Sequence, residues 1–214
     1  MIPPWVHSDL ARELEPPAEV MRLSETRSPE ATLLITRILL GLSLPGPKTL
    51  LMRGVVPDAM LPIRYAPSEV GTKCNFFATD VAQLHRAPLP HRWRITPDGA
   101  LQWMSANDMT LALRRGLYPG WRPVAFQKLG ELDVVERAAR GLPTVAAWFN
   151  PTAVRDDDGA MRHLSGHIVW VVETPPGKSG IYVTGAGRTC VDQCPIEQAF
   201  GPHTREVEFY GFER

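Results

Sequence analysis

The sequence predicts an α+β domain in which helices come first and an antiparallel sheet follows. Apolar residues recur at helical spacing in two N-terminal segments, 33–42 and 74–84. After Pro143 the pattern changes to short runs rich in β-branched and aromatic residues, separated by Asp, Gly and Pro clusters. Connections this short join antiparallel strands, so we expect the helix that starts near Cys74 to pack on a C-terminal sheet. The expected strands cover 144–149, 168–172, 181–184 and 206–210.

Composition and charge narrow the class of protein. The chain has 214 residues, 44% of them hydrophobic, which is enough for one large core. Its 23 Lys and Arg residues balance 23 Asp and Glu residues, which argues against binding nucleic acid or anionic lipid through a broad cationic surface. The longest apolar stretch, Leu33 to Leu42, contains Arg37 and Gly41 and is too short for a membrane span. The first 15 residues are too charged for a secretory signal, so we expect synthesis in the cytoplasm and export, if any, by another route.

Two regions are expected along the chain. Residues 1–45 are assigned to an N-terminal arm and a helix that packs on the core, and residues 46–214 to the main domain. In the first region Ser28 is a typical helix N-cap and Pro29 suits the first helical position. We expect the apolar helix that follows to end by Gly46-Pro47.

Three further helices are expected before the sheet. They span about 74–85, 105–116 and 129–139. Cys74 lies on the first turn of the first helix, and Ser105 begins a capping-box pattern at the start of the second. Between these two helices, Pro88 to Leu101 is expected to form a loop.

Cys74 and His167 are the residues best suited to chemistry. A thiol at a helix N-terminus lies at the positive end of the helix dipole and near unpaired N–H groups, which favour the thiolate. A thiolate that attacks an amide also needs an imidazole that protonates the leaving amine. His167 follows Gly166 at the start of an apolar strand, where the backbone would fix its position. The alternative is that Cys74 is a buried small hydrophobe and His167 a strand-end histidine.

Two segments around these residues carry ordered motifs. The first is Gly71-Thr72-Lys73-Cys74-Asn75-Phe76-Phe77-Ala78-Thr79-Asp80-Val81, and the second is Gly166-His167-Ile168-Val169. They resemble the "C-N-x-F-x-x-D" helix start and the "G-H-I/V-x-x-V" strand of NlpC/P60-like and related papain-like peptidoglycan amidases. The segment Tyr182 to Gly187 is similar to the strand that follows in those enzymes. The resemblance covers Tyr65 to Gly187 with the elements in the same order.

The resemblance implies a papain-like fold and a cysteine hydrolase that cleaves an amide in a peptidoglycan stem peptide or cross-link. Cys74 would be the nucleophile that forms an acyl-enzyme, and His167 the general base and then the general acid. Similar families place His, Gln or Asn on the next strand to orient the imidazole, and here that position is Gly185. We therefore expect Thr184 or a main-chain carbonyl to hold the ring.

A cell-wall substrate also implies a route to the wall. We expect a secreted antibacterial effector, a toxin delivered by a type VI secretion apparatus into the periplasm of a rival, with an immunity protein in the producer. A phage-type lysin is the alternative, although no repeat-type wall-binding module is visible. Two other hypotheses for the function remain. The chain could be an inactive relative that binds a peptide in the same groove, or a cysteine peptidase or transferase with a protein substrate.

Other clusters of potential ligands predict no metal or cofactor. His163 and His167 are four residues apart on a strand-like segment, which separates them by about 13 Å. Cys190, Cys194 and His203 offer three ligands without the usual paired spacing of a zinc site. The two cysteines could be thiols or a disulfide, depending on the compartment. The segment Gly185-Ala186-Gly187-Arg188 lacks the Lys-Ser/Thr pair and the following helix that a phosphate-binding loop requires.

Overall fold

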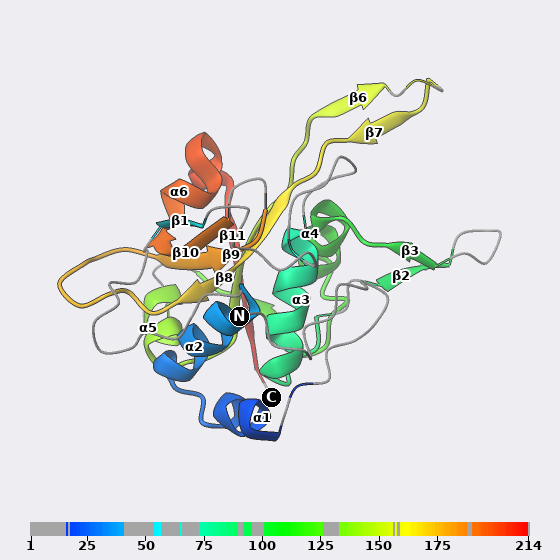
Figure 1. Ribbon diagram of the computed structural model, residues 1–214. Helices are drawn as coiled ribbons and strands as arrows, with labels where there is room; N and C mark the ends of the chain where they lie inside the picture. Colours follow the sequence, from blue (N-terminus) through cyan, green and yellow to red (C-terminus); the bar gives the residue numbers. More distant parts are fainter. Residues whose placement is uncertain are drawn as a thin grey trace.

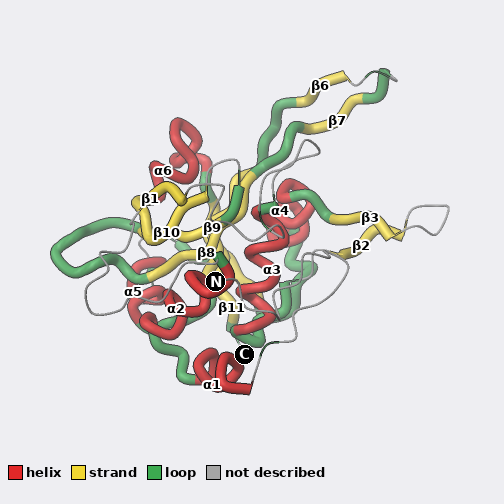
Figure 2. The backbone as a smooth tube through the Cα atoms, in the orientation of Figure 1, coloured by secondary structure: helices red, strands yellow, loops and turns green. Residues whose placement is uncertain are grey.

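The fold is a seven-stranded antiparallel sheet with helices packed on both faces (Figures 1 and 2). It is described from a computed structural model, and the described residues are 16, 18–40, 54–56, 65, 73–89, 92–95, 101–125, 133–155, 157, 159–187 and 190–213. The α+β class predicted from the sequence is confirmed. No helix among these residues is long and apolar enough to cross a membrane.

The main sheet has the strand order β1-β10-β9-β8-β5-β11-β4, and each of these neighbouring pairs is antiparallel. Its strands are β1 (Gly54–Val56), β4 (Trp121–Pro123), β5 (Thr144–Trp148), β8 (His167–Val172), β9 (Tyr182–Gly185), β10 (Cys190–Pro195) and β11 (Glu208–Phe212). Two separate hairpins, β2 (Arg92–Ile95) with β3 (Leu101–Trp103) and β6 (Ala153–Arg155) with β7 (Met161–His163), project from the body (Figure 1).

Helices cover the two faces of this sheet. They are α1 (Ala18–Glu25), α2 (Pro29–Leu39), α3 (Cys74–Leu84), α4 (Ala106–Arg114), α5 (Val134–Ala139), α6 (Ile196–Phe200) and the 3-10 helix η2 (Gly201–Glu206). Three of them start at side chains that satisfy backbone N–H groups. Ser28 caps α2, while Ser105 and Asp133 form capping boxes at α4 and α5.

Strand β8 separates two hydrophobic cores. Ile168, Trp170 and Val172 point to the face covered by α1 to α4, which we call the α3-side core. Val169 and Val171 point to the face covered by α5 and α6, which we call the α6-side core. All five side chains are almost fully buried, because successive residues of a strand alternate between faces and both faces are covered.

Several expected elements are confirmed and others are corrected. The helices expected at 74–85 and 105–116 and all four expected strands are present, with ends that differ by a few residues. The expected loop from Pro88 to Leu101 is wrong, because β2 and β3 pair as a hairpin there. Strands β1, β4, β6, β7 and β10 were not expected. Helix α2 ends at Leu39 with Leu40 as its C-cap, several residues before the expected end at Gly46-Pro47. Most of the N-terminal arm, residues 1–15, lies outside the described residues.

A buried ion pair ties the N-terminal helix α2 to the sheet. Nε of Arg37 lies 3.0 Å from Oδ2 and 3.2 Å from Oδ1 of Asp192 in β10, and Nη2 donates to Oε1 of Gln193 at 3.3 Å. Both charged side chains are almost completely buried. A register shift between Val191 and Cys194 places Asp192 and Gln193 at an irregular point of the strand. The helix of the 1–45 region therefore forms part of the sheet's covering layer.

Replacing Arg37 by Met should destabilise the protein by about 3 kcal/mol, because the buried carboxylate of Asp192 loses its guanidinium. Urea unfolding followed by circular dichroism measures the loss. Arg115→Met is the matched control, since Arg115 is exposed at the end of α4 and its loss should change the free energy of unfolding by less than about 0.5 kcal/mol. Equal midpoints for the two variants would show that α2 is not held by this pair.

Candidate functional site

Cys74 is the first residue of α3, as the sequence predicts. Its N-cap, Lys73, makes no side-chain bond to the helix end, so the first-turn N–H groups are not capped from that side chain. The side chain of Cys74 is only 1% exposed. The sulfur of Cys74 therefore lies at the positive end of the α3 dipole, as expected for a nucleophile. Because the side chain is buried, a substrate can reach the sulfur only after the groups that cover it move.

The other residues of the cysteine motif have structural roles. Asn75 donates from Nδ2 to the carbonyl of Met104 at 2.6 Å. Phe77 is fully buried in the α3-side core, and the carboxylate of Asp80 accepts a hydrogen bond of 2.6 Å from the hydroxyl of Tyr65. The motif thus fixes the start and the orientation of α3 independently of any catalysis.

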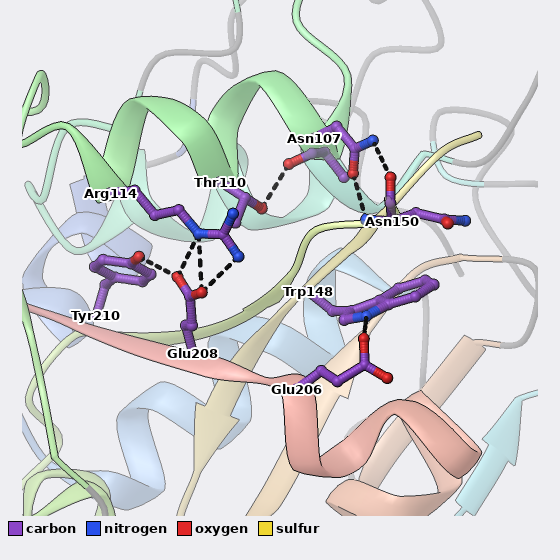
Figure 3. A network of polar contacts seen from close by, with 9 residues as sticks. Asn107, Thr110, Arg114, Trp148, Asn150, Glu206, Glu208 and Tyr210 are labelled. Atoms are coloured by element: carbon purple, nitrogen blue, oxygen red, sulfur yellow. Dashed lines mark hydrogen bonds and ion pairs between the residues drawn. The ribbon is translucent and has the colours of Figure 1, made fainter. Parts of the chain in front are cut away.

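The start of α4 links the cysteine end of α3 to the histidine end of β8. Met104, which accepts from Asn75, stands just before α4. In the first turn of α4, Asn107 donates to the carbonyl of Asn150 at 3.1 Å and accepts from the N–H of Asn150 at 2.8 Å (Figure 3). It also donates to the carbonyl of Leu164 at 2.9 Å. A Cβ at Gly166 would lie 2.3 Å from Oδ1 of Asn107, so this approach requires glycine. Cys74 and His167 consequently lie at the same end of the sheet.

His167 is the first residue of β8 and lies opposite Trp148 of β5. Its ring is 5.2 Å from the ring of Phe200 in α6, centroid to centroid. A Cβ at Gly187 would lie 2.7 Å from Cε1 of His167, so the ring packs directly on the backbone after β9. Burial lowers the pKa of His167 to about 4, and the ring is neutral at neutral pH.

These contacts place the His167 ring on the α6 side of the sheet, whereas Cys74 lies in the α3-side core. The register agrees, because His167 shares the face of Val169 and Val171 while Ile168 and Trp170 face α3. The catalytic pairing of the two residues stays a prediction.

The expectation that Thr184 orients the imidazole is wrong. Its hydroxyl donates to the carbonyl of Val191 at 3.0 Å, and it lies opposite Trp170, on the α3 side. Gly185 is required for packing, because a Cβ there would lie 2.7 Å from Cγ1 of Val169. A main-chain carbonyl remains the expected partner for the ring.

Cys190 and Cys194 are both thiols, on opposite sides of β10. Cys190 belongs to the α3-side core and accepts from the N–H of Gly187 at 3.4 Å, whereas Cys194 belongs to the α6-side core. Burial raises the pKa of Cys194 to about 12, so its thiol is protonated. A disulfide between two side chains that point to opposite faces would disrupt the strand. In the part of the chain that the structure describes, no three His, Cys, Asp or Glu side chains are grouped for a metal ion.

A polar cluster that sequence reasoning missed lies beside His167. The rings of Trp148 and His203 stack at 4.0 Å, Nε1 of Trp148 donates to Oε2 of Glu206 at 3.0 Å (Figure 3), and Nδ1 of His203 lies 3.2 Å from Oε1 of Glu206. Hydrogen bonds from Trp148 and His203 lower the pKa of Glu206. Trp148 and His167 lie opposite each other in β5 and β8 and therefore share a face of the sheet. The sequence does not predict this cluster, because the pairing register of the two strands cannot be deduced from one sequence.

Comparison of the chain with protein-family models, curated proteins and solved structures finds no match. We therefore infer its function from its own residues.

His167 should make the protein acid-labile. Its folded pKa of about 4 lies below the ordinary 6.5, so the unfolded state binds the proton more readily and stability falls as the pH drops between these values. His167→Gln should remove up to about 3 kcal/mol of this loss, as measured by urea unfolding at about pH 7 and about pH 4.5. Buried His85, with its pKa also lowered to about 4, should contribute further acid sensitivity in both proteins.

His163→Gln is the control, because His163 is exposed on the β6–β7 hairpin. Its acid sensitivity should equal that of the unmodified protein. An identical loss of stability in the His167 and His163 variants would mean that His167 ionises as freely in the folded chain as in the unfolded one.

Proposed function

We propose that this chain is a papain-like cysteine hydrolase of the NlpC/P60 type that cleaves an amide in peptidoglycan stem peptides or cross-links. The observation that supports it best is the position of Cys74, the first residue of a helix packed on an antiparallel sheet, at the end where His167 begins β8. His167 is neutral at neutral pH and can accept a proton, but it acts as an effective general base only when the ring leaves its buried site and its pKa rises toward neutrality.

The reaction follows from these two groups. The thiol of Cys74 passes its proton to the imidazole, and the sulfur attacks the carbonyl carbon of the amide to give a tetrahedral oxyanion. The imidazolium then protonates the leaving amine as the C–N bond breaks, which leaves a thioester. A water molecule gives its proton to the imidazole and attacks the thioester, and Cys74 regains its proton as the acid product leaves. N–H groups at the start of α3 are suitably placed donors for the oxyanion.

The proposal requires that the resting site rearrange. The His167 ring must leave Phe200 and turn toward the α3 side, and the groups that cover Cys74 must open. His167 is at the very start of β8, where one strand end can turn without breaking the sheet's central pairing. We propose that substrate binding drives this change, so that the pair forms only with the peptide in place.

The biological role that fits such an activity is attack on the cell wall. We propose an antibacterial effector that acts in the periplasm of a rival cell, with an immunity protein as its partner in the producer. The alternative role is that of a lysin used in phage release, which would cleave the same kind of amide.

A binding module without hydrolysis is the second candidate, and one observation favours it. The His167 ring packs against Phe200 and Gly187, away from the face on which Cys74 lies. In this case the chain would bind a wall peptide at the same end of the sheet and release no product.

Cys74→Ala should abolish the release of peptide fragments from purified sacculi, because the sulfur forms the acyl-enzyme. Mass spectrometry of the soluble fragments measures the activity and identifies the bond. Cys194→Ala is the matched control, since it removes another buried thiol that belongs to the α6-side core. It should retain activity. Release by Cys74→Ala at the control's rate would exclude Cys74 as the nucleophile.

Alkylation by iodoacetamide distinguishes the enzyme from the binding module. If the pair forms when a wall peptide is bound, His167→Gln should slow the alkylation of Cys74 about tenfold in the presence of that peptide, because less thiolate is present. Peptide mapping by mass spectrometry follows Cys74 separately from Cys190 and Cys194. His163→Gln is the control and should leave the rate unchanged. Equal rates with and without a wall peptide, in both variants, would favour the binding module.

A further inference from the structure

A small pocket lies at the other end of α3 from Cys74. His85, the residue that caps the C-terminal end of α3, forms part of its wall. The pocket has a volume of about 220 Å³ and is lined by Arg27, His85, Arg137, Leu142, Pro143, Phe212 and Glu213. It therefore combines two guanidinium groups, one imidazole and one carboxylate with an apolar wall.

The imidazole of His85 is buried without a hydrogen bond. The side chain is only 5% exposed, and neither Nδ1 nor Nε2 has a partner among the described residues. The ring stacks on Trp170 of β8, with centroids 5.4 Å apart and planes 17° from parallel. Burial and the charge of Arg27 hold the pKa of His85 at about 4, so the neutral ring offers one donor and one acceptor. Such groups normally have partners, because each unpaired one costs about 1–3 kcal/mol.

Arg137 is held rigidly at the pocket wall. Its Nε donates to Oγ1 of Thr144 at 3.2 Å, and its Nη2 donates to the carbonyl of Phe212 at 3.0 Å. The guanidinium lies flat against Gly211, where a Cβ would come within 2.4 Å of Cζ. Nη1 faces the carboxylate of Glu213 at 3.5 Å, which is too long for a good hydrogen bond.

Arg27 supplies a second cation in an unusual backbone conformation. Its φ is +46°, in the left-handed region that arginine rarely adopts, and its carbonyl packs against Gly141. The side chain is exposed and close enough to act on the charge of His85. Glu213 is also mostly exposed, so its carboxylate can leave Arg137 at little cost.

We propose that this pocket binds a small carboxylate whose apolar part packs on Leu142, Pro143 and Phe212. The carboxylate would accept from Arg27 and His85 and reach Nη1 of Arg137 in place of Glu213. The apolar wall favours a carboxylic acid with a hydrocarbon part over inorganic phosphate, which would leave that wall facing water. The site lies at the opposite end of α3 from Cys74, so it does not depend on the proposed hydrolase.

Benzoate titrated into the full chain tests the site. We expect saturable binding, seen as a shift of the His85 ring proton on Cε1 by NMR, with acetate and inorganic phosphate at least about tenfold weaker. Arg27→Gln should weaken benzoate binding about tenfold. Arg115→Gln, which changes an exposed arginine just after α4, should bind benzoate as the unmodified chain does. Binding that is unsaturated, or equally tight in both variants, would overturn the proposal, and tighter phosphate would assign the pocket to phosphate groups instead.

His85→Phe is a second test that does not depend on the arginines. Phenylalanine keeps the stacking on Trp170 and removes both unpaired nitrogens, so it should raise the urea midpoint of the unliganded protein while it abolishes benzoate binding. Benzoate affinity that survives in His85→Phe would show that the imidazole is not part of the site.

Discussion

The two-sided burial of β8 is the constraint on which the rest of the structure depends. The strand lies at the centre of the main sheet, and its side chains from Ile168 to Val172 are buried alternately against α3 and against the α5–α6 layer. A shift of the register by one residue would exchange the two sets of side chains. It would also move Trp170 away from His85 and bring His167 to the face of α3. The same alternation that gives the domain two well-packed cores therefore decides on which side the imidazole lies.

The sequence predicts the helices well because their signals are local. Ser28 and Ser105 cap the helices that they were expected to start, and the apolar spacing from Cys74 onward gives α3 to within one residue. Strand β10 was missed because its centre is Asp192 and Gln193, which resemble turn residues. Their burial is stabilised by Arg37, which lies 155 residues away in the chain. No local pattern indicates such a pair.

The candidate site is only half predictable for a similar reason. The motifs place Cys74 at a helix start and His167 at a strand start, and the bonds of Asn75 and Asn107 bring these two ends together. The sequence does not predict toward which face of the sheet the His167 side chain points. Every residue after it in β8 is apolar, so the pattern is compatible with either orientation of the strand. The β2–β3 hairpin differs from the expected loop, although Arg92 to Ile95 alternates polar and apolar residues as a strand does.

The two ends of α3 present opposite electrostatic conditions. The N-terminal end favours a thiolate at Cys74, and the C-terminal end favours a cation at His85. His85 nevertheless stays neutral, because burial and Arg27 oppose its charge more strongly than the helix end supports it. Among the described residues, Arg137 and Glu213 line the same pocket, and the neighbouring Arg86 is paired with Glu25. A carboxylate bound between the arginines would offset the field of Arg27, so that the helix end and the ligand would then both favour a protonated His85. Binding at this pocket would in that case take up a proton, and the imidazolium would face the indole of Trp170 in the core that α3 shares with β8.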